Sequence, residues 1–159
     1  MPSQRIRLRN ILFGIVVVGI LSTLLSPVIC PPHCSKGNRC AGNLRQLYQL
    51  GTVYASAHKG EWPREKGSAL WLSFSKSSPP LLERDHLEML GCPVRGEWEP
   101  GQCDYIGPRK PISELRPGEA LGACKPGNHG EATSGNVLLK DGSVVEYDFS
   151  DPVWDTLTP

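Results

Sequence analysis

The sequence predicts an α+β fold that is carried on one N-terminal transmembrane helix. Three patterns support this fold class. An apolar run without charges occupies residues 11–29, an amphipathic helical pattern starts at residue 38, and a β-hairpin pattern covers residues 136–149. With 159 residues, the chain has room for one domain and an anchor but not for two domains.

The overall composition excludes several functional classes. The formal net charge is +1, so the chain lacks the basic character of nucleic-acid-binding proteins. Its 17 glycines and 15 prolines indicate a folded domain with many turns rather than a disordered chain. The sequence contains no Gly-rich phosphate loop, no Ser-His-Asp order and no paired-carboxylate pattern, so we expect a protein that is not an enzyme.

The apolar run at residues 11–29 is predicted to be a membrane anchor. Its 19 residues, among them Ile11, Val18 and Leu25, would form a helix about 28 Å long, enough to cross the hydrocarbon core. Arginines 5, 7 and 9 precede the run, and positive charge favours the cytoplasmic side. We therefore expect a cytoplasmic tail at residues 1–10 and a single pass through the inner membrane, with the rest of the chain outside the cytoplasm.

Two other interpretations of the N-terminal segment stay open. A cleaved signal peptide would also have a basic start and an apolar run, although no clear small-x-small cleavage site follows. A lipoprotein would carry its lipid on Cys30, but the residues before it, Pro27-Val28-Ile29, are not the small ones expected there. The uncleaved anchor is therefore the favoured interpretation.

Six cysteines in so short a chain require an explanation. They are Cys30, Cys34, Cys40, Cys92, Cys103 and Cys124. No two of them are spaced as CxxC, and zinc sites usually include one close pair, so disulfides in an oxidising compartment are favoured over a structural metal. A catalytic thiol would need a base and an orienting partner, for which His129 and Asp141 are the only obvious candidates.

After the anchor, paired prolines and a helical pattern predict an elbow and then a helix. Pro31 and Pro32 cannot continue a helix, so residues 30–37 are predicted to form a juxtamembrane elbow, followed by a head at residues 38–159. A helix is expected from Asn38 to about His58. Its predicted apolar stripe consists of Leu44, Leu47, Tyr48, Gly51, Tyr54, Ala55 and His58. Lys59-Gly60 should end this helix.

The middle of the chain gives weaker signals. Residues 67–75 are predicted to form a short helix or a strand, and residues 81–90 a second short helical stretch. Turn residues dominate residues 94–127, with one strand expected near residues 103–106.

The clearest local prediction is a C-terminal hairpin. Asp141-Gly142 should form a two-residue type I′ turn between the strands at residues 136–140 and 143–149. In that register Leu138 lies opposite Val145, and Leu139 lies opposite Val144.

Several stretches, in this order, are typical of one family. They are residues 40–47 with Asn43 and Leu44, Trp62-Pro63, Cys92-Pro93, His129-Gly130, and residues 135–144 with Asn136, Asp141 and Gly142. In this set the chain resembles the pilin-like, or type II secretion pseudopilin-like, proteins with a C-terminal His-spacer-Asp-Gly (H-X9-DG) signature. The spacer here holds eleven residues, and the apolar run contains no glutamate.

The resemblance implies a non-enzymatic, membrane-anchored structural and assembly protein of a type II secretion or type IV pilus-like system, with protein partners and a possible homo-oligomer. It also implies a bridge between Cys40 and Cys92, and we expect Cys103–Cys124 and Cys30–Cys34 as well, three of the pairings that six cysteines allow.

His129 is expected to hold its loop against the hairpin by a hydrogen bond. No cofactor is expected, although calcium, which major pseudopilins hold in a C-terminal loop, is conceivable near Asp148, Asp151 and Asp155. The alternatives are a stand-alone membrane-tethered binding module and, second, a thiol-redox protein or other extracytoplasmic enzyme.

Overall fold

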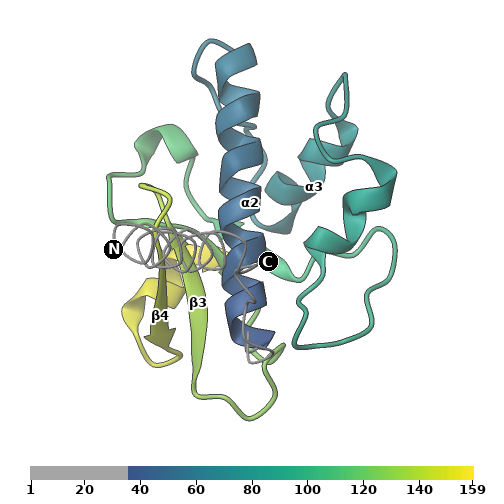
Figure 1. Ribbon diagram of the computed structural model, residues 1–159. Helices are drawn as coiled ribbons and strands as arrows, with labels where there is room; N and C mark the ends of the chain where they lie inside the picture. The colour runs from purple at the N-terminus through teal and green to yellow at the C-terminus, as the bar shows by residue number, and fades with distance from the viewer. Residues whose placement is uncertain (1–35) are drawn as a thin grey trace, which may run out of the picture. The chain divides into compact units, whose positions relative to one another are not determined.

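The computed structural model describes residues 36–159, which form an α+β unit (Figure 1). Its helices are α2 (Lys36–Ala57) and α3 (Ser68–Lys76), with short 3-10 helices η1 (Arg84–Leu90), η2 (Ile112–Glu114) and η3 (Pro152–Thr156). Its strands are β1 (Tyr105–Pro108), β2 (Ala120–Cys124), β3 (Ser134–Leu139), β4 (Val144–Asp148) and β5 (Leu157–Thr158). The strands form one five-stranded antiparallel sheet in the order β4-β3-β2-β1-β5.

The structure corrects the predicted fold class in its transmembrane component. Among residues 36–159, no helix is long and apolar enough to cross a membrane. The longest, α2, has 22 residues, but polar and charged side chains such as Arg39 and Arg45 recur along it, so its pattern is amphipathic. The predicted tail and anchor, and the elbow up to residue 35, lie outside the described residues, and α2 begins at Lys36, within the predicted elbow.

Helix α2 confirms the predicted amphipathic helix to within two residues at its start. Every member of the predicted stripe except His58 is buried or half-buried, and Leu44 and Leu47 have no exposed surface. His58 lies just past the helix and is exposed, with its ring stacked on Tyr54 at a centroid distance of 3.8 Å. The chain leaves the helix through Lys59 and Gly60, which both have positive φ, as the stop signal predicted.

The sheet separates two hydrophobic cores. The larger core lies between the sheet and the two helices, and it contains Trp71 and Phe74 of α3 and Leu138 of β3. Figure 1 shows α2 running alongside β3, with α3 next to it. The smaller core contains Val137 and Leu157 and is flanked by side chains of η3. Both faces of the central strands are therefore covered, which explains why β2 is buried at every position.

The C-terminal hairpin exists, but its predicted register is wrong by one residue. Leu138 pairs with Val144, and Val137 pairs with Val145. The turn has three residues, because Leu139 N donates to Ser143 O at 2.8 Å and Gly142 N donates to Leu139 O at 3.0 Å. Only Gly142, with φ of 88°, has positive φ in this turn, so it is a type I turn followed by a left-handed glycine, not type I′.

The least accurate prediction concerns residues 94–127. The expected strand near residues 103–106 is confirmed as β1, but β2 lies where turns were predicted, and β5 was not expected. Strand β2 is rich in alanine and glycine, which have weak strand propensity, and its pairing with β1 and β3 depends on distant residues. Gly122 is needed there, since a Cβ would lie 2.3 Å from Cζ2 of Trp71.

Candidate metal centre

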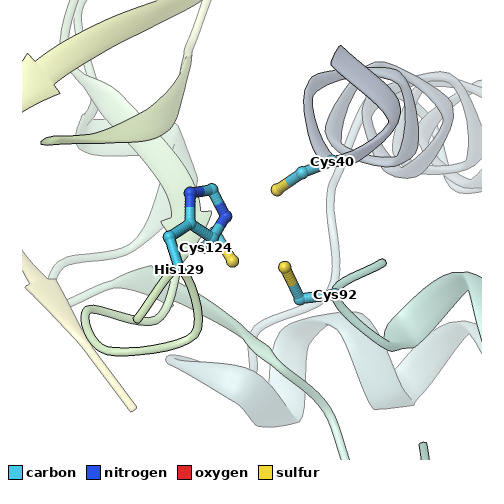
Figure 2. A group of neighbouring side chains, drawn as sticks. All are labelled: Cys40, Cys92, Cys124 and His129. Atoms are coloured by element: carbon cyan, nitrogen blue, oxygen red, sulfur yellow. The ribbon is translucent and has the colours of Figure 1, made fainter. Parts of the chain in front are cut away.

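Three thiols and an imidazole converge at one end of the larger core. They belong to Cys40, Cys92, Cys124 and His129, and one potential ligand atom from each lies within 4.8 Å of all the others. Figure 2 shows the sulfur atoms of Cys40 and Cys92 pointing toward each other, toward the Cys124 sulfur and toward the His129 ring. Among the described residues, no second group of three or more such ligands occurs.

The four side chains come from separate parts of the fold. Cys40 lies in the second turn of α2, Cys92 follows η1, Cys124 ends β2, and His129 lies in the loop before β3. The three cysteines are at most 2% exposed. The helix, the loop after η1 and the sheet therefore meet at this cluster.

The His129 ring contains a buried polar atom without a partner. Its Nε2 is buried and makes no hydrogen bond, the only such side-chain nitrogen or oxygen in residues 36–159. A buried nitrogen without a hydrogen bond costs about 1–3 kcal/mol. Its position against three sulfur atoms gives it a chemical environment in which a metal ion would be its natural partner.

The pKa of each of the three thiols depends on its contacts with the other two. Hydrogen bonds from the Cys124 and Cys40 thiols, helped by the backbone N–H groups of Val94 and Arg95, lower the pKa of Cys92 to about 2. The contact with Cys124 favours the thiolate of Cys40, but Cys92 and burial outweigh it and raise the pKa of Cys40 to about 12. The contacts with Cys40 and Cys92, together with burial, raise the pKa of Cys124. Cys92 is therefore the one thiol of the three whose pKa its surroundings lower.

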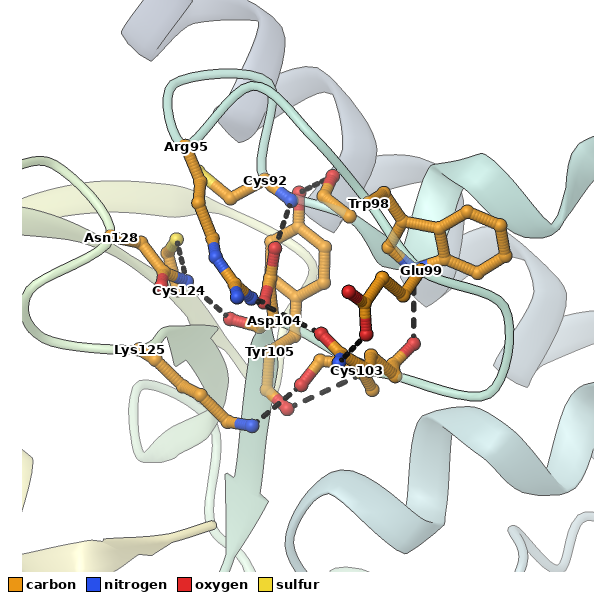
Figure 3. A network of polar contacts seen from close by, with 12 residues as sticks. Cys92, Arg95, Trp98, Glu99, Cys103, Asp104, Tyr105, Cys124, Lys125 and Asn128 are labelled. Carbon is orange, nitrogen blue, oxygen red and sulfur yellow. Dashed lines mark hydrogen bonds and ion pairs between the residues drawn. The ribbon is translucent and has the colours of Figure 1, made fainter.

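Asp104 connects the loop of Cys92 to the sheet. Its carboxylate is 3% exposed; Oδ2 accepts a hydrogen bond from the Cys92 backbone N–H at 2.9 Å, and Oδ1 accepts from Arg95 Nη1 at 2.7 Å (Figure 3). Its own backbone N–H donates to Leu90 O at 2.8 Å. Because both carboxylate oxygens are engaged, Asp104 fixes the turn that presents the Cys92 sulfur.

The same aspartate also holds the loop that carries Cys124 and His129. Its carbonyl oxygen accepts from Lys125 N at 2.9 Å and from Asn128 Nδ2 at 3.0 Å. Asn128 Nδ2 also lies 3.5 Å from Cys124 Sγ, as a second, longer contact. Asp104 therefore links the turn of Cys92 to the strand end and loop that supply Cys124 and His129.

The four cysteines of the described chain are free thiols, so neither Cys40–Cys92 nor Cys103–Cys124 is bridged in the structure. Cys103 lies outside the cluster, where its Sγ donates to Tyr105 O at 3.5 Å and burial raises its pKa to about 12. Cys30 and Cys34, and hence their predicted bridge, lie outside the described residues.

The other predicted site residues have structural positions. Asn43 Nδ2 donates to Met89 O at 3.3 Å and to Gly91 O at 3.2 Å, and thereby ties α2 to the segment that leads to Cys92-Pro93. Asp141 Oδ1 accepts from Ser143 N at 2.9 Å within the hairpin turn. Leu44 is in the larger core, and the Asn136 side chain hydrogen-bonds Cys40, which favours its thiolate and opposes the rise of its pKa.

The acidic residues considered for calcium do not form a site in the described chain. Asp148, Asp151 and Asp155 are not grouped as ligands. Asp151 instead caps η3, where its Oδ1 accepts from Val153 N at 2.8 Å.

A polar cavity of about 560 Å³ lies beside the Cys92 turn. It is bounded by the first half of α2, by η1 and by residues 91–98, and its lining includes Arg39, Gln46, His86 and Trp98. Cys92 is the only member of the cluster that lines this cavity. Cys92 therefore borders this cavity, although only 2% of its surface is exposed.

Two features of the centre were missed in the sequence. One is Asp104, which carries no recognisable motif. The other is the short spacing of Cys124 and His129, with four residues between them, which resembles the close ligand pairs of zinc sites. A search for close pairs of cysteines alone overlooks a pair made of one cysteine and one histidine.

Comparison of the chain with models of protein families, with curated proteins and with solved structures finds no match.

Proposed function

We propose that this chain is a non-enzymatic, pseudopilin-like structural protein that assembles with partner proteins of a type II secretion or type IV pilus-like system. The observation that carries the proposal is the packing of the long helix α2 alongside an antiparallel sheet that ends in the Asp141-Gly142 hairpin. A long helix that precedes and covers a small antiparallel sheet is the layout that the family resemblance implies.

The residues that carry the resemblance support this proposal by their positions. Asn43 bonds the backbone before Cys92, and Trp62 packs near Tyr48 at a ring centroid distance of 5.8 Å. A Cβ on Gly142 would lie 2.6 Å from the Tyr48 ring, so the hairpin turn approaches α2 closely. These residues hold helix, loop and hairpin together, as expected for a head that presents surfaces to partners.

The outer face of α2 is the surface that we propose for assembly. Val53 on this helix is 51% exposed, the most exposed large hydrophobic side chain in residues 36–159. Thr52 and Ser56 beside it are exposed too, and their hydroxyls bond backbone carbonyls of their own helix. The face therefore offers an apolar residue among small polar ones, without a charge at these three positions.

A second candidate function, a stand-alone binding module, is favoured by the polar cavity beside Cys92. Its lining combines Arg39, His86 and Glu88 with the Trp98 ring, a mixture suited to a small polar ligand. In this case the head would act as a monomer, and α2 would have no partner.

Photocrosslinking separates the two functions. The full chain with a benzophenone amino acid at Val53 is expressed in its native host membranes and irradiated; the matched control carries the same group at Val145, which is 40% exposed on β4. Assembly through α2 predicts a ladder of crosslinked products from position 53 and a much weaker one from position 145. Monomers alone from position 53 would overturn the assembly proposal and favour the binding module.

A further inference from the structure

We propose that Cys40, Cys92, Cys124 and His129 bind one zinc ion that braces the fold. Neither the sequence prediction nor the proposed assembly function includes zinc, and the proposal does not depend on that function. It rests on the convergence of four ligand atoms within 4.8 Å and on the buried, unpartnered Nε2 of His129.

The donor set and its dimensions suit zinc. Three thiolates and one imidazole are a common structural zinc set, and tetrahedral Zn–S bonds of about 2.3 Å place sulfur atoms about 3.8 Å apart. The observed limit of 4.8 Å is within reach of that spacing through small side-chain rotations. Soft thiolates disfavour calcium and magnesium, which take oxygen ligands. We therefore assign Zn²⁺ rather than a hard cation.

Zinc would satisfy the imidazole. In neutral histidine one ring nitrogen is an acceptor with a free lone pair, and a metal takes that lone pair. Nε2 of His129 is the atom that has no hydrogen bond in the structure. A bond from Nε2 to zinc would remove the only buried, unpartnered side-chain nitrogen or oxygen in residues 36–159.

Nearby hydrogen-bond donors can stabilise the negative charge of the zinc site. Each coordinated thiol loses its proton to solvent, so Zn²⁺ with three thiolates and a neutral imidazole carries a net charge of −1. The backbone N–H groups of Val94 and Arg95 favour the Cys92 thiolate, and Asn128 Nδ2 lies 3.5 Å from Cys124 Sγ. These donors offset negative charge on sulfur, as outer-shell groups do in structural zinc sites.

The site would be structural rather than catalytic. Four protein ligands complete a tetrahedron, and catalytic zinc sites keep one position for water or substrate. The cysteines are at most 2% exposed, so the cluster has little contact with solvent. Zinc would join α2, the loop after η1 and the end of β2 at one point.

A disulfide would engage fewer of the four side chains of the cluster than a metal ion would. Only one bridge can form among three thiols, so the third thiol and the imidazole would take no part in it. Cys103, which could make the number even, lies outside the cluster and donates to Tyr105 O. The geometry of the described residues therefore favours one metal ion over the predicted pair of bridges.

Metal analysis of the full chain tests the proposal. Purified without added chelator, it is expected to contain one zinc per chain by mass-spectrometric metal analysis. Cys40→Ser, Cys92→Ser, Cys124→Ser and His129→Ala should each lower the affinity for zinc at least 100-fold. The matched control, Cys103→Ser, removes a buried thiol outside the cluster and should retain one zinc. The double variant Cys30→Ser/Cys34→Ser should retain it too, which excludes the N-terminal thiols as ligands.

Cobalt substitution of the wild-type chain keeps the test decisive if a ligand variant does not fold. Co²⁺ in a Cys3His site should give the intense d–d bands of tetrahedral cobalt and sulfur-to-metal charge transfer that corresponds to three thiolates. A chain without zinc whose intact mass is lower by two hydrogens per bridge would overturn the proposal. So would a six-coordinate cobalt spectrum, or zinc retained by folded Cys124→Ser. Metal analysis tests the zinc site, and crosslinking from position 53 tests assembly. Failure of one proposal can therefore be distinguished from failure of the other.

Discussion

The carboxylate of Asp104 accepts the backbone N–H of Cys92 at 2.9 Å and places this cysteine among the other sulfur atoms. The second carboxylate oxygen is held by Arg95 Nη1 at 2.7 Å. The buried side chain of Asp104 therefore holds the loop after η1, which lies outside regular secondary structure.

Replacing Asp104 with asparagine should weaken zinc binding. The amide can keep only one of the two contacts, because its NH2 group would face either the Cys92 N–H or the Arg95 guanidinium, which are both donors. We expect the zinc affinity of Asp104→Asn to fall about 10- to 100-fold, as for other outer-shell groups. Competition with a chromophoric chelator measures this loss, at a temperature where circular dichroism shows the variant to be folded.

Glu99→Gln is the matched control for this substitution. Glu99 is an exposed acidic residue of the same loop, and within residues 36–159 its carboxylate accepts a hydrogen bond only from Gln102. Its zinc affinity should equal that of the wild type. An equal loss in both variants would mean that Asp104 acts through the net charge of the loop and not through its hydrogen bonds.

Removal of zinc should destabilise the wild-type chain. A ligand that binds only the folded state contributes about 4 kcal/mol when its free concentration is about 1,000 times its Kd. Excess chelator is therefore expected to lower the urea midpoint of the zinc-saturated protein strongly. Cys40→Ser, which lacks one ligand, should show the same midpoint with and without chelator. A wild-type midpoint that does not respond to chelator would be inconsistent with a bracing metal.

Gly142→Ala should destabilise the hairpin more than an equivalent change elsewhere. Gly142 has φ of 88°, and a Cβ there would lie 2.6 Å from Tyr48 Cε1. Gly118 has a similar φ of 83° but no atom within 4 Å of its Cβ position, so Gly118→Ala is the matched control. The control should cost about 1–2 kcal/mol from the left-handed backbone alone, and Gly142→Ala about 1–3 kcal/mol more from overpacking. Urea unfolding measures both, and equal costs would show that Tyr48 moves aside freely.

Glu119 should make stability depend on pH in the acid range. Its carboxylate accepts from Lys110 Nζ at 2.9 Å, from Arg116 N at 2.7 Å and from the Arg116 guanidinium at 3.0 Å. These partners lower its pKa from 4.5 to about 2. Because the folded pKa lies below the unfolded one, the stabilisation is complete above about pH 4.5 and is lost as the pH falls toward 2.

Glu119→Gln tests this dependence. The difference in unfolding free energy between wild type and variant should be constant above pH 4.5 and should shrink as the pH falls toward 2. Added salt should reduce the difference at neutral pH, since the Lys110 and Arg116 partners are partly exposed and their charges are screened. A difference that grows on acidification would contradict the assignment.

The sequence predicted those parts of the fold that depend on local patterns. Helix α2 has a stripe that repeats every three to four residues and a clear stop at Lys59-Gly60, so its extent was predictable. The hairpin was predictable from Asp141-Gly142 between two strand patterns, but its register was not. A three-residue turn with Asp141 bonded to Ser143 competes with the two-residue turn, and in the structure Gly142 of that turn lies close to the Tyr48 ring.

The parts that were not predicted depend on residues far apart in the chain. Strand β2 is built of small residues, and it is a strand because β1 and β3 lie on either side of it. The centre likewise requires Cys40 and Cys92 to meet a pair, Cys124 and His129, that lies beyond β1 and η2. Spacing can identify the local pair, but only the folded chain brings the other two ligands to it.

The strand order has a consequence for aggregation of the protein. The sheet ends on one side at β4, where Glu146 and Asp148 are exposed, and on the other at β5, which has only two residues. Acidic groups and very short border strands both oppose the addition of a strand from a neighbouring molecule. The two edges of the sheet therefore disfavour strand pairing between molecules of this protein at high concentration.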